Sequence, residues 1–336
     1  MRIAGRWGWG VFAAVVTAAG TARAGEADEG STGETATPRA EGEAREPATE
    51  GEHESAMLAL DLVLGWGKVP FALQNQPTSG NQGITYTRSD ATESNVQSLL
   101  LGGSLEVGEH FGVGARLPLT FAGFSPDGAA SRSTAAVGNL ELEGEYSTSL
   151  ARNLRFIAAL GVALPSAGGT EVPPGLTNAS AASVNEGSYD RWSLAKAAAY
   201  ARGYEDNALF EPQRFGLVPR VAVIYHLRGL SIEPSVKVEN LIGTSSSLDA
   251  AYVGELVASL RLGYWVHRQF EVAVKGWVNG GFAGSSDDRT TAASLEPALV
   301  LKFGPVRPYA GVIVPLAGPP SDNGFIGVRV GVAAAL

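Results

Sequence analysis

Apolar residues recur at every second position from Met57 to the C-terminus. In the last such segment one face carries Ile326, Val328, Val330, Val332, Ala334 and Leu336, and the other carries Gly327, Arg329, Gly331, Ala333 and Ala335. Successive side chains of a β-strand point to opposite faces. The pattern therefore predicts strands with one apolar face and one face that tolerates small or charged residues.

Twelve segments share this period. They are predicted near residues 58–66, 96–107, 111–122, 136–147, 153–164, 214–227, 229–242, 250–264, 269–280, 291–303, 306–316 and 326–336. Most have the length of a tilted strand that crosses a bilayer, about 9–11 residues or slightly more. The predicted fold class is all-β: an antiparallel up-and-down transmembrane barrel of about 12 strands.

The connections between these segments alternate between long and short. The long ones are 68–95, 123–135, 165–213, 243–249, 281–290 and 317–324, and the short ones lie near 108–110, 148–152, 228, 267–268 and 304–305. Outer-membrane barrels have short periplasmic turns and longer extracellular loops. An even number of strands then predicts that both the N- and the C-terminus of the barrel are periplasmic.

Over residues 57–336 this pattern resembles the bacterial outer-membrane β-barrel superfamily, with a porin-like architecture and no specific family indicated. The apolar C-terminal strand looks like the signal that the barrel-assembly machinery recognises, although the last residue there is usually aromatic and here is Leu336. The resemblance implies an outer-membrane location and contact with lipid and lipopolysaccharide. Outward aromatic residues near strand ends, such as Trp66 and Phe303, fit the girdles of such barrels. A soluble β-sandwich is the alternative, but rarely has so many long alternating strands.

The first 56 residues differ from the rest. Arg2 and Arg6 precede an apolar stretch that ends at the small-residue motif Ala22-Arg23-Ala24, which predicts a secretory signal peptide over residues 1–24. A membrane-anchoring helix is the alternative. Residues 25–56 hold ten acidic and two basic residues and no aromatic one, which predicts a disordered acidic periplasmic tail. The barrel domain is predicted over residues 57–336.

Composition excludes several kinds of site. The chain has no cysteine, so disulfides, thiolate metal ligands and lipoprotein acylation are excluded. A net charge of −9 argues against a nucleic-acid partner, because nucleic acid requires a basic face.

Charged residues within the strands have the parity of the inner face. The candidate lumen-lining residues are Asp61, Arg116, Glu141, Glu143, Glu145, Arg155, Arg220, Lys237, Glu255, Arg261, Lys275 and Arg329. They line an aqueous pore of mixed polarity or form ion pairs that fill the lumen. Their near balance of signs argues against strong ion selectivity, which is obtained with rings of one sign. For the run from Glu141 to Glu145, pairing with Arg116 or Arg155 is favoured over a cation site.

The long connection 165–213 contains one predicted helix, from Asp190 as N-cap to Gly203 as terminator. Long loops in compact domains are usually functional or disordered. This loop is predicted to be a plug inside the lumen, with Trp192, Tyr200 and Arg202 as candidate plug residues, or a cover over the outer rim.

The leading functional hypothesis is a passive channel for small solutes. The second is a structural or surface-interaction barrel with a salt-bridged lumen, and a weaker third is a transporter of hydrophobic solutes, for which Leu100, Ile157, Ile224 and Ile313 are scattered candidates. Enzymatic activity is not predicted, because the four histidines lie in the tail or at the periplasmic end and provide no base for a serine nucleophile near the outer rim. No catalytic, cofactor-binding or metal site is predicted.

Overall fold

The structure is a computed structural model that describes residues 56–75, 85–172, 179–180, 186–245, 248, 250–284 and 290–336. These residues belong to one compact unit, Glu50–Leu336. The predicted signal peptide (1–24) and the acidic tail (25–56), apart from Ala56, lie outside the described residues.

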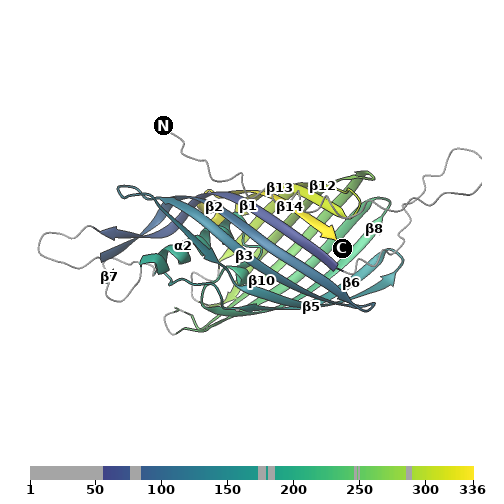
Figure 1. Cartoon of the computed structure of the whole chain (residues 1–336), viewed down its shortest axis with the longest axis horizontal. Coiled ribbons are helices and arrows are strands. Elements are labelled where there is room, and N and C mark those ends of the chain that lie inside the picture. Colours follow the sequence, from purple (N-terminus) through teal and green to yellow (C-terminus); the bar gives the residue numbers. More distant parts are fainter. Residues whose placement is uncertain are drawn as a thin grey trace, which may run out of the picture. The chain divides into compact units, whose positions relative to one another are not determined.

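Twelve strands form a closed antiparallel barrel (Figure 1). They are β1 (Ala56–Asn75), β2 (Thr85–Val107), β3 (Phe111–Ser125), β5 (Leu140–Ala151), β6 (Leu154–Leu164), β8 (Arg214–Leu227), β9 (Leu230–Gly243), β10 (Tyr252–His267), β11 (Phe270–Ala283), β12 (Thr291–Leu301), β13 (Val306–Ala317) and β14 (Ile326–Ala335). Each strand pairs with its neighbour in sequence order, and β14 pairs with β1, with Met57 opposite Ala335 and Trp66 opposite Ile326. This ring confirms the predicted fold class and strand number.

The two ends of the barrel differ, as the alternating connections predict. Short turns join β2 to β3, β5 to β6, β8 to β9, β10 to β11 and β12 to β13. In the turn between β8 and β9, Arg228 and Gly229 both have positive φ, at 47° and 86°, as a two-residue hairpin turn of type I′ requires. The longer connections all lie at the other end, called here the loop end.

The predicted loop 68–95 is wrong over most of its length. β1 continues to Asn75 and β2 already begins at Thr85, so the two strands stay paired well beyond Trp66, with Asn75 opposite Thr85. The short strand β7 (Ala179–Ser180) pairs with the start of β2. The first hairpin therefore extends past the rest of the wall at the loop end.

The predicted boundaries also differ around 123–135. β3 continues to Ser125 and pairs with the short strand β4 (Arg132–Val137), which is separated from β5 by Gly138 and Asn139. At this interruption the Asn139 amide donates to the carbonyl oxygen of Ala208 at 2.8 Å, so the wall opens locally to bind a residue from within the barrel.

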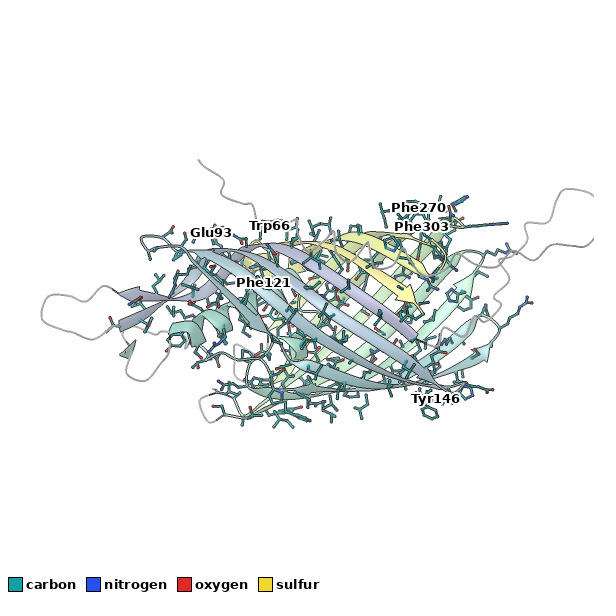
Figure 2. All side chains as sticks on the ribbon, in the orientation of Figure 1. Trp66, Glu93, Phe121, Tyr146, Phe270 and Phe303 are labelled. Atoms are coloured by element: carbon teal, nitrogen blue, oxygen red, sulfur yellow. The ribbon has the colours of Figure 1, made fainter. Side chains whose placement is uncertain are left out.

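Side-chain parity follows the prediction. Leu58 and Trp66 are exposed on the outside, whereas Val63 on the other face of β1 is fully buried. Two groups of outward aromatic residues are separated along the barrel (Figure 2): Trp66 and Phe121 lie toward the loop end, and Tyr146, Phe270 and Phe303 lie at the short-turn end. The exposed apolar band between them has the form of a lipid-facing surface.

Helices contribute little to the wall. Helix α2 (Glu186–Ala201) and the 3-10 turn η1 (Asn207–Leu209) belong to the connection between β6 and β8, and α3 (Pro319–Asp322) is a single turn before β14. None of the helices in the described ranges has the length and apolar character needed to span a membrane.

Candidate functional site: a segment inside the barrel

The residues from 186 to 213, called here the internal segment, run from α2 through η1 to the start of β8. The predicted helix is present, but it begins at Glu186 rather than after Asp190. Asp190 is therefore not the N-cap. It lies within α2, where its carboxylate is 3.5 Å from an Nη2 of Arg132 on β4.

The end of α2 matches the prediction. The N–H of Gly203 donates to Tyr200 O and that of Tyr204 to Ala199 O, each at 2.9 Å. These two bonds form a Schellman motif, which needs a left-handed residue at the Gly203 position. Gly203 has a φ of 62°. The chain therefore turns sharply after α2 and directs residues 204–208 across the barrel.

Helix α2 is buried on nearly all sides. Leu194, Ala197, Ala198 and Ala201 are all inaccessible to solvent, which is unusual for a loop helix and typical of one enclosed by protein. The buried apolar cluster to which α2 belongs also includes inward residues from several parts of the wall: Val63, Val96, Leu100, Val257, Trp277 and Ile313. The small alanine side chains allow this close approach: a Cβ placed on Gly65 of β1 would overlap Ala201.

Arg202 anchors the end of α2 to β1 and β2. Its side chain is fully buried, and Nη1 contacts Asp61 Oδ2 at 2.7 Å. Nε donates to Ser98 Oγ at 2.9 Å, and Nη2 donates to the carbonyl oxygens of Asp61 and Ser98, each at 3.2 Å. The guanidinium donors are thus distributed over one carboxylate, one hydroxyl and two backbone oxygens, as a buried cation requires.

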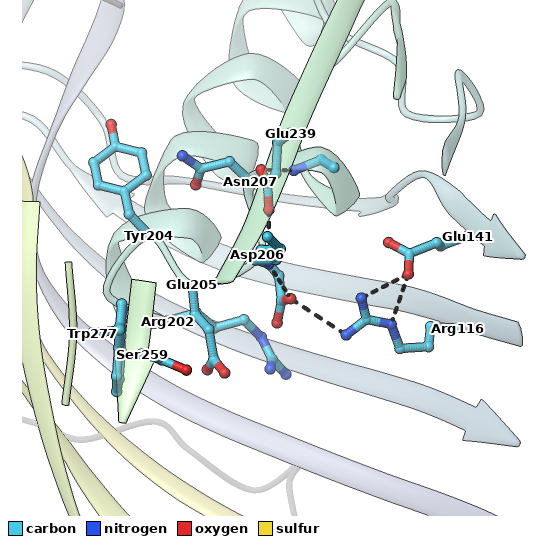
Figure 3. A network of polar contacts seen from close by, with 12 residues as sticks. Arg116, Glu141, Arg202, Tyr204, Glu205, Asp206, Asn207, Glu239, Ser259 and Trp277 are labelled. Carbon is cyan, nitrogen blue, oxygen red and sulfur yellow. Dashed lines mark hydrogen bonds and ion pairs between the residues drawn. The ribbon is translucent and has the colours of Figure 1, made fainter. Parts of the chain in front are cut away.

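Two adjacent acids, Glu205 and Asp206, each contact two cations of the wall. Glu205 contacts Lys275 on β11 and Arg329 on β14, the latter at 3.0 Å. Asp206 contacts Lys237 on β9 at 2.9 Å and Arg116 on β3 at 3.3 Å. Figure 3 shows Asp206 facing Arg116, which also binds Glu141. The two carboxylates are thereby bound to different arcs of the barrel.

The environment of these two acids favours their charged forms. Burial alone would raise the pKa of Glu205, but Lys275 and Arg329 lower it to about 2. Burial likewise opposes ionisation of Asp206, and Lys237 and Arg116 hold its pKa well below the usual range. Both side chains are therefore carboxylates throughout the physiological pH range.

The next two residues contact a pair of wall glutamates that lie opposite each other, Glu239 on β9 and Glu255 on β10. Asn207 Nδ2 donates to Glu255 Oε2 at 2.7 Å, and the backbone N–H of Ala208 donates to Glu239 Oε2 at 2.9 Å. Asn279 of β11 donates to the same oxygen of Glu255 at 2.8 Å. The segment thus provides donors to wall acids as well as acids to wall cations.

Backbone carbonyls complete the anchoring on β11 and β12. Gly203 O accepts from Trp277 Nε1 at 2.7 Å and from Ser294 Oγ at 3.3 Å, and Tyr204 O accepts from Asn279 Nδ2 at 3.1 Å. Hydrogen bonds and ion pairs therefore connect the segment to β1, β2, β3, β9, β10, β11, β12 and β14. Apolar packing adds β6 and β8 around Ala208, and β13 through Ile313. At this level the segment crosses the lumen.

The lumen between this level and the short turns is lined differently. Many inward positions here are small: Ala59, Gly102, Ser104, Gly112, Gly114, Ala159, Ala222, Ala273, Ala298 and Ala333. Arg220 of β8 contacts Glu143 at 3.0 Å and Glu145 at 3.1 Å, and all three side chains keep about a quarter of their surface exposed. Solvent therefore reaches these ion pairs on the inner wall, and this half of the lumen is called here the vestibule.

The predicted lumen-lining residues thus fall into two groups. Seven lie at the level of the internal segment: Asp61, Arg116, Glu141, Lys237, Glu255, Lys275 and Arg329. Five lie on the inner parity nearer the short turns: Glu143, Glu145, Arg155, Arg220 and Arg261. The expected pairing of the acidic run is found with Arg116 for Glu141, whereas Glu143 and Glu145 pair with Arg220.

The predicted plug residues have different environments. Arg202 forms the anchor described above, Tyr200 packs against Tyr204 and Phe325, and Trp192 lies nearer the mouth with Tyr189 and Tyr86. Sequence reasoning missed Glu205, Asp206 and Asn207. Their only sequence signal is a polar run directly after a helix terminator, which is also the usual composition of a solvated loop.

Three of the four histidines, His110, His226 and His267, lie in the part of the chain that the structure describes, and each is near a short turn. His110 Nδ1 donates to the backbone oxygen of Ser147 at 3.1 Å. Across the described ranges, no group of three or more His, Asp and Glu residues is arranged to hold a metal ion.

Solved structures with a similar fold are outer-membrane proteins. An outer-membrane channel from Pseudomonas putida F1 matches 85% of this chain and 98% of its own, with a TM-score of 0.52 and 17% identity. Two other solved structures are more distant. The KdgM porin in complex with disordered oligogalacturonate is 9% identical and matches 83% of this chain and 99% of its own, with a TM-score of 0.41. A mutant of the TodX monoaromatic hydrocarbon channel is 9% identical and matches 84% of this chain and 91% of its own, with a TM-score of 0.42. No family model matches the chain, and no curated protein matches it significantly. The chain has the same β-barrel fold as the outer-membrane channel from Pseudomonas putida F1.

Proposed function

We propose that the protein is a passive outer-membrane channel for small solutes, and that the internal segment constricts it. The observation that carries this proposal is the vestibule. Its inner wall combines small residues with ion pairs that remain partly exposed, such as Arg220 with Glu143. A barrel built only as a structural element has no need for a hydrated half, whereas a channel does.

The orientation and partners belong to the same proposal. Short turns are periplasmic in outer-membrane barrels, so the vestibule opens to the periplasm, both ends of the barrel chain are periplasmic, and the internal segment enters from the cell surface. The outward apolar band contacts lipid, and the outer rim contacts lipopolysaccharide. The strand Ile326–Ala335 is the part that the barrel-assembly machinery recognises. The signal peptide and the acidic tail are the remaining proposed regions.

A second candidate function is a permanently filled structural barrel. It is favoured by the number of strands to which the internal segment is bound, with Arg202, Glu205, Asp206 and Asn207 all engaged. The third hypothesis, a hydrophobic-solute transporter, has less support. Of its candidate residues, Leu100 and Ile313 pack against the internal segment and do not form a separate apolar path.

The two leading functions can be separated by removing the segment without disturbing the wall. The N–H of Gln213 donates to Ala167 O at 3.3 Å, so the ends of the loop already meet. Replacing residues 168–212 by a short glycine-rich turn should leave β6 and β8 paired. The matched control replaces the single turn 319–322, which lies in another loop.

The assay is liposome swelling in isotonic solutions of small neutral solutes. We expect slow swelling with the natural chain and with the control, and rapid swelling with the deletion variant, because the vestibule then continues to the cell-surface side. A deletion variant that folds but admits no solute would contradict the channel proposal and favour the filled barrel.

A further inference from the structure

Four wall cations converge on the two adjacent acids of the internal segment, although the acids come from a loop and the cations from four separate strands. Lys275 and Arg329 contact Glu205, and Lys237 and Arg116 contact Asp206. The wall therefore provides two pairs of cations, one from β3 and β9 and one from β11 and β14. Such charge-assisted contacts to carboxylates are the strongest hydrogen bonds that side chains make.

Wall acids hold three of the four cations independently of the segment, and one of these contacts joins Lys237 to Glu239 at 2.8 Å. Arg116 binds Glu141 through Nη2 at 2.8 Å and uses Nη1 for Asp206. Arg329 binds Glu296 through Nη1 at 2.7 Å and uses Nη2 for Glu205. In both arginines the nitrogen that faces the loop acid is a different one from the nitrogen that binds the wall acid. Removing the loop acids therefore leaves oriented donors directed at the lumen.

We propose that Arg116, Lys237, Lys275 and Arg329 form a binding site for a small solute with two carboxylate groups, and that Glu205 and Asp206 occupy this site as an internal substitute for it. The inference rests on the proposed channel function, because the solute has to enter the lumen. A dicarboxylate would compete with the loop acids for the same donors and so would favour displacement of the internal segment. A monocarboxylate could replace only one of the two acids.

The environment of the loop acids supports this assignment. The wall makes Glu205 and Asp206 more acidic than free carboxyl groups in spite of their burial. A site that stabilises two buried carboxylates of the chain provides the same stabilisation to two carboxylates of a ligand. Wall acids lie at the same level, among them Glu141 and Glu296, but each arginine keeps a separate nitrogen for the loop acid.

The test is a calorimetric titration of the folded protein in detergent micelles with succinate, with acetate and putrescine as controls. In the natural chain the site is occupied by the loop acids. The variant Glu205→Gln/Asp206→Asn, called here the vacated variant, removes both loop carboxylates from the site while preserving side-chain size. We expect it to bind succinate at least about 10-fold more tightly than the natural chain does, with little binding of acetate and none of putrescine.

Two further variants identify the site. Adding Lys237→Met and Lys275→Met to the vacated variant should abolish the gain in succinate affinity, whereas adding Arg155→Met, which removes a cation from the vestibule, should leave the gain unchanged. If the vacated variant does not fold, the deletion of 168–212 removes the same two acids and replaces it in the titration.

Equal succinate affinity of the natural and vacated proteins, or a gain that survives loss of both lysines, would overturn the proposal. The titration needs no ion flow, so its outcome is separate from that of the channel function. A protein that conducts but does not bind succinate would refute the dicarboxylate site alone. A protein that binds succinate but never conducts would refute the channel alone.

Discussion

Replacing Arg202 by methionine should release the internal segment from β1 and β2. Methionine fills a similar volume without a charge, so the change removes the contact with Asp61 at 2.7 Å and the donors to Ser98 while largely preserving packing. Asp61 keeps a weaker contact with Arg329, whose Nε lies 3.4 Å from Asp61 Oδ1. In the variant Asp61 of the wall therefore keeps one cationic partner, whereas the segment loses its contact with Asp61.

The expected magnitude follows from burial. Removing one partner of a buried ion pair costs about 3–5 kcal/mol, because the other charge is left without compensation. Since Arg329 partly compensates Asp61, we expect the lower end, about 3 kcal/mol. The loss acts on the equilibrium between the docked and the released segment, and about 1.4 kcal/mol corresponds to a factor of ten. The released population should therefore rise by roughly 100-fold.

Two assays detect this release. Trypsin should cleave the folded natural protein slowly at Lys196, whose side chain is largely buried against Glu211 at 2.6 Å, and the Arg202→Met variant much faster. In planar bilayers the variant should also show more frequent open events. The control is Arg155→Met, which alters an exposed side chain that donates to Ser147 Oγ and should change neither readout. Cleavage and opening within about twofold of the natural protein would refute the anchoring role of Arg202.

Three other changes test separate parts of the account. Gly65→Val should displace the end of α2, because its Cβ would overlap Ala201, and should therefore raise conductance. The control Gly144→Val, with open space around its Cβ, should leave conductance unchanged. Equal conductance of the two variants would argue against close packing between Gly65 and α2. Val330→Arg on the outer face should destabilise the barrel in urea titrations by about 2–4 kcal/mol, and Ala333→Arg on the inner face by clearly less; the reverse order would mean that the parity is inverted. Glu205→Gln should lower the free energy of unfolding by about 3 kcal/mol above about pH 4.5. This loss should vanish as pH falls toward 2, because a carboxyl group with a lowered pKa stabilises the folded protein only while it is ionised. A difference between variant and natural protein that is unchanged at pH 2 would rule out this origin.

The barrel could be predicted from the sequence because each spanning strand needs apolar side chains on the face toward lipid and tolerates small or charged ones on the face toward the lumen. That requirement produces the strict alternation seen from Leu58 to Trp66. Beyond the rim the requirement ends. The start of β2 is a run of Thr, Ser and charged residues whose composition is typical of loops, and its strand structure depends on pairing with the end of β1. This is why the prediction of a loop over 68–95 was wrong.

The candidate site was only partly predictable, for a related reason. Inward parity identified the wall charges, and the alanine-rich run ending at Gly203 identified the helix. The contacts between Glu205 or Asp206 and the wall join residues up to 124 positions apart in the chain, and no local pattern encodes such pairing. The N-terminal boundary of α2 was also missed, because Asp190 has the residue type of a cap but forms an ion pair from within the helix instead.

The most direct test of the account is single-channel conductance in planar bilayers, measured for the natural protein and for the variant in which a short turn replaces residues 168–212. We expect rare or small openings for the natural protein and stable, ohmic steps of much larger conductance for the variant. Equal conductance of the two folded proteins would contradict the claim that the internal segment constricts the lumen, and silence from both would contradict the claim that the barrel is a channel.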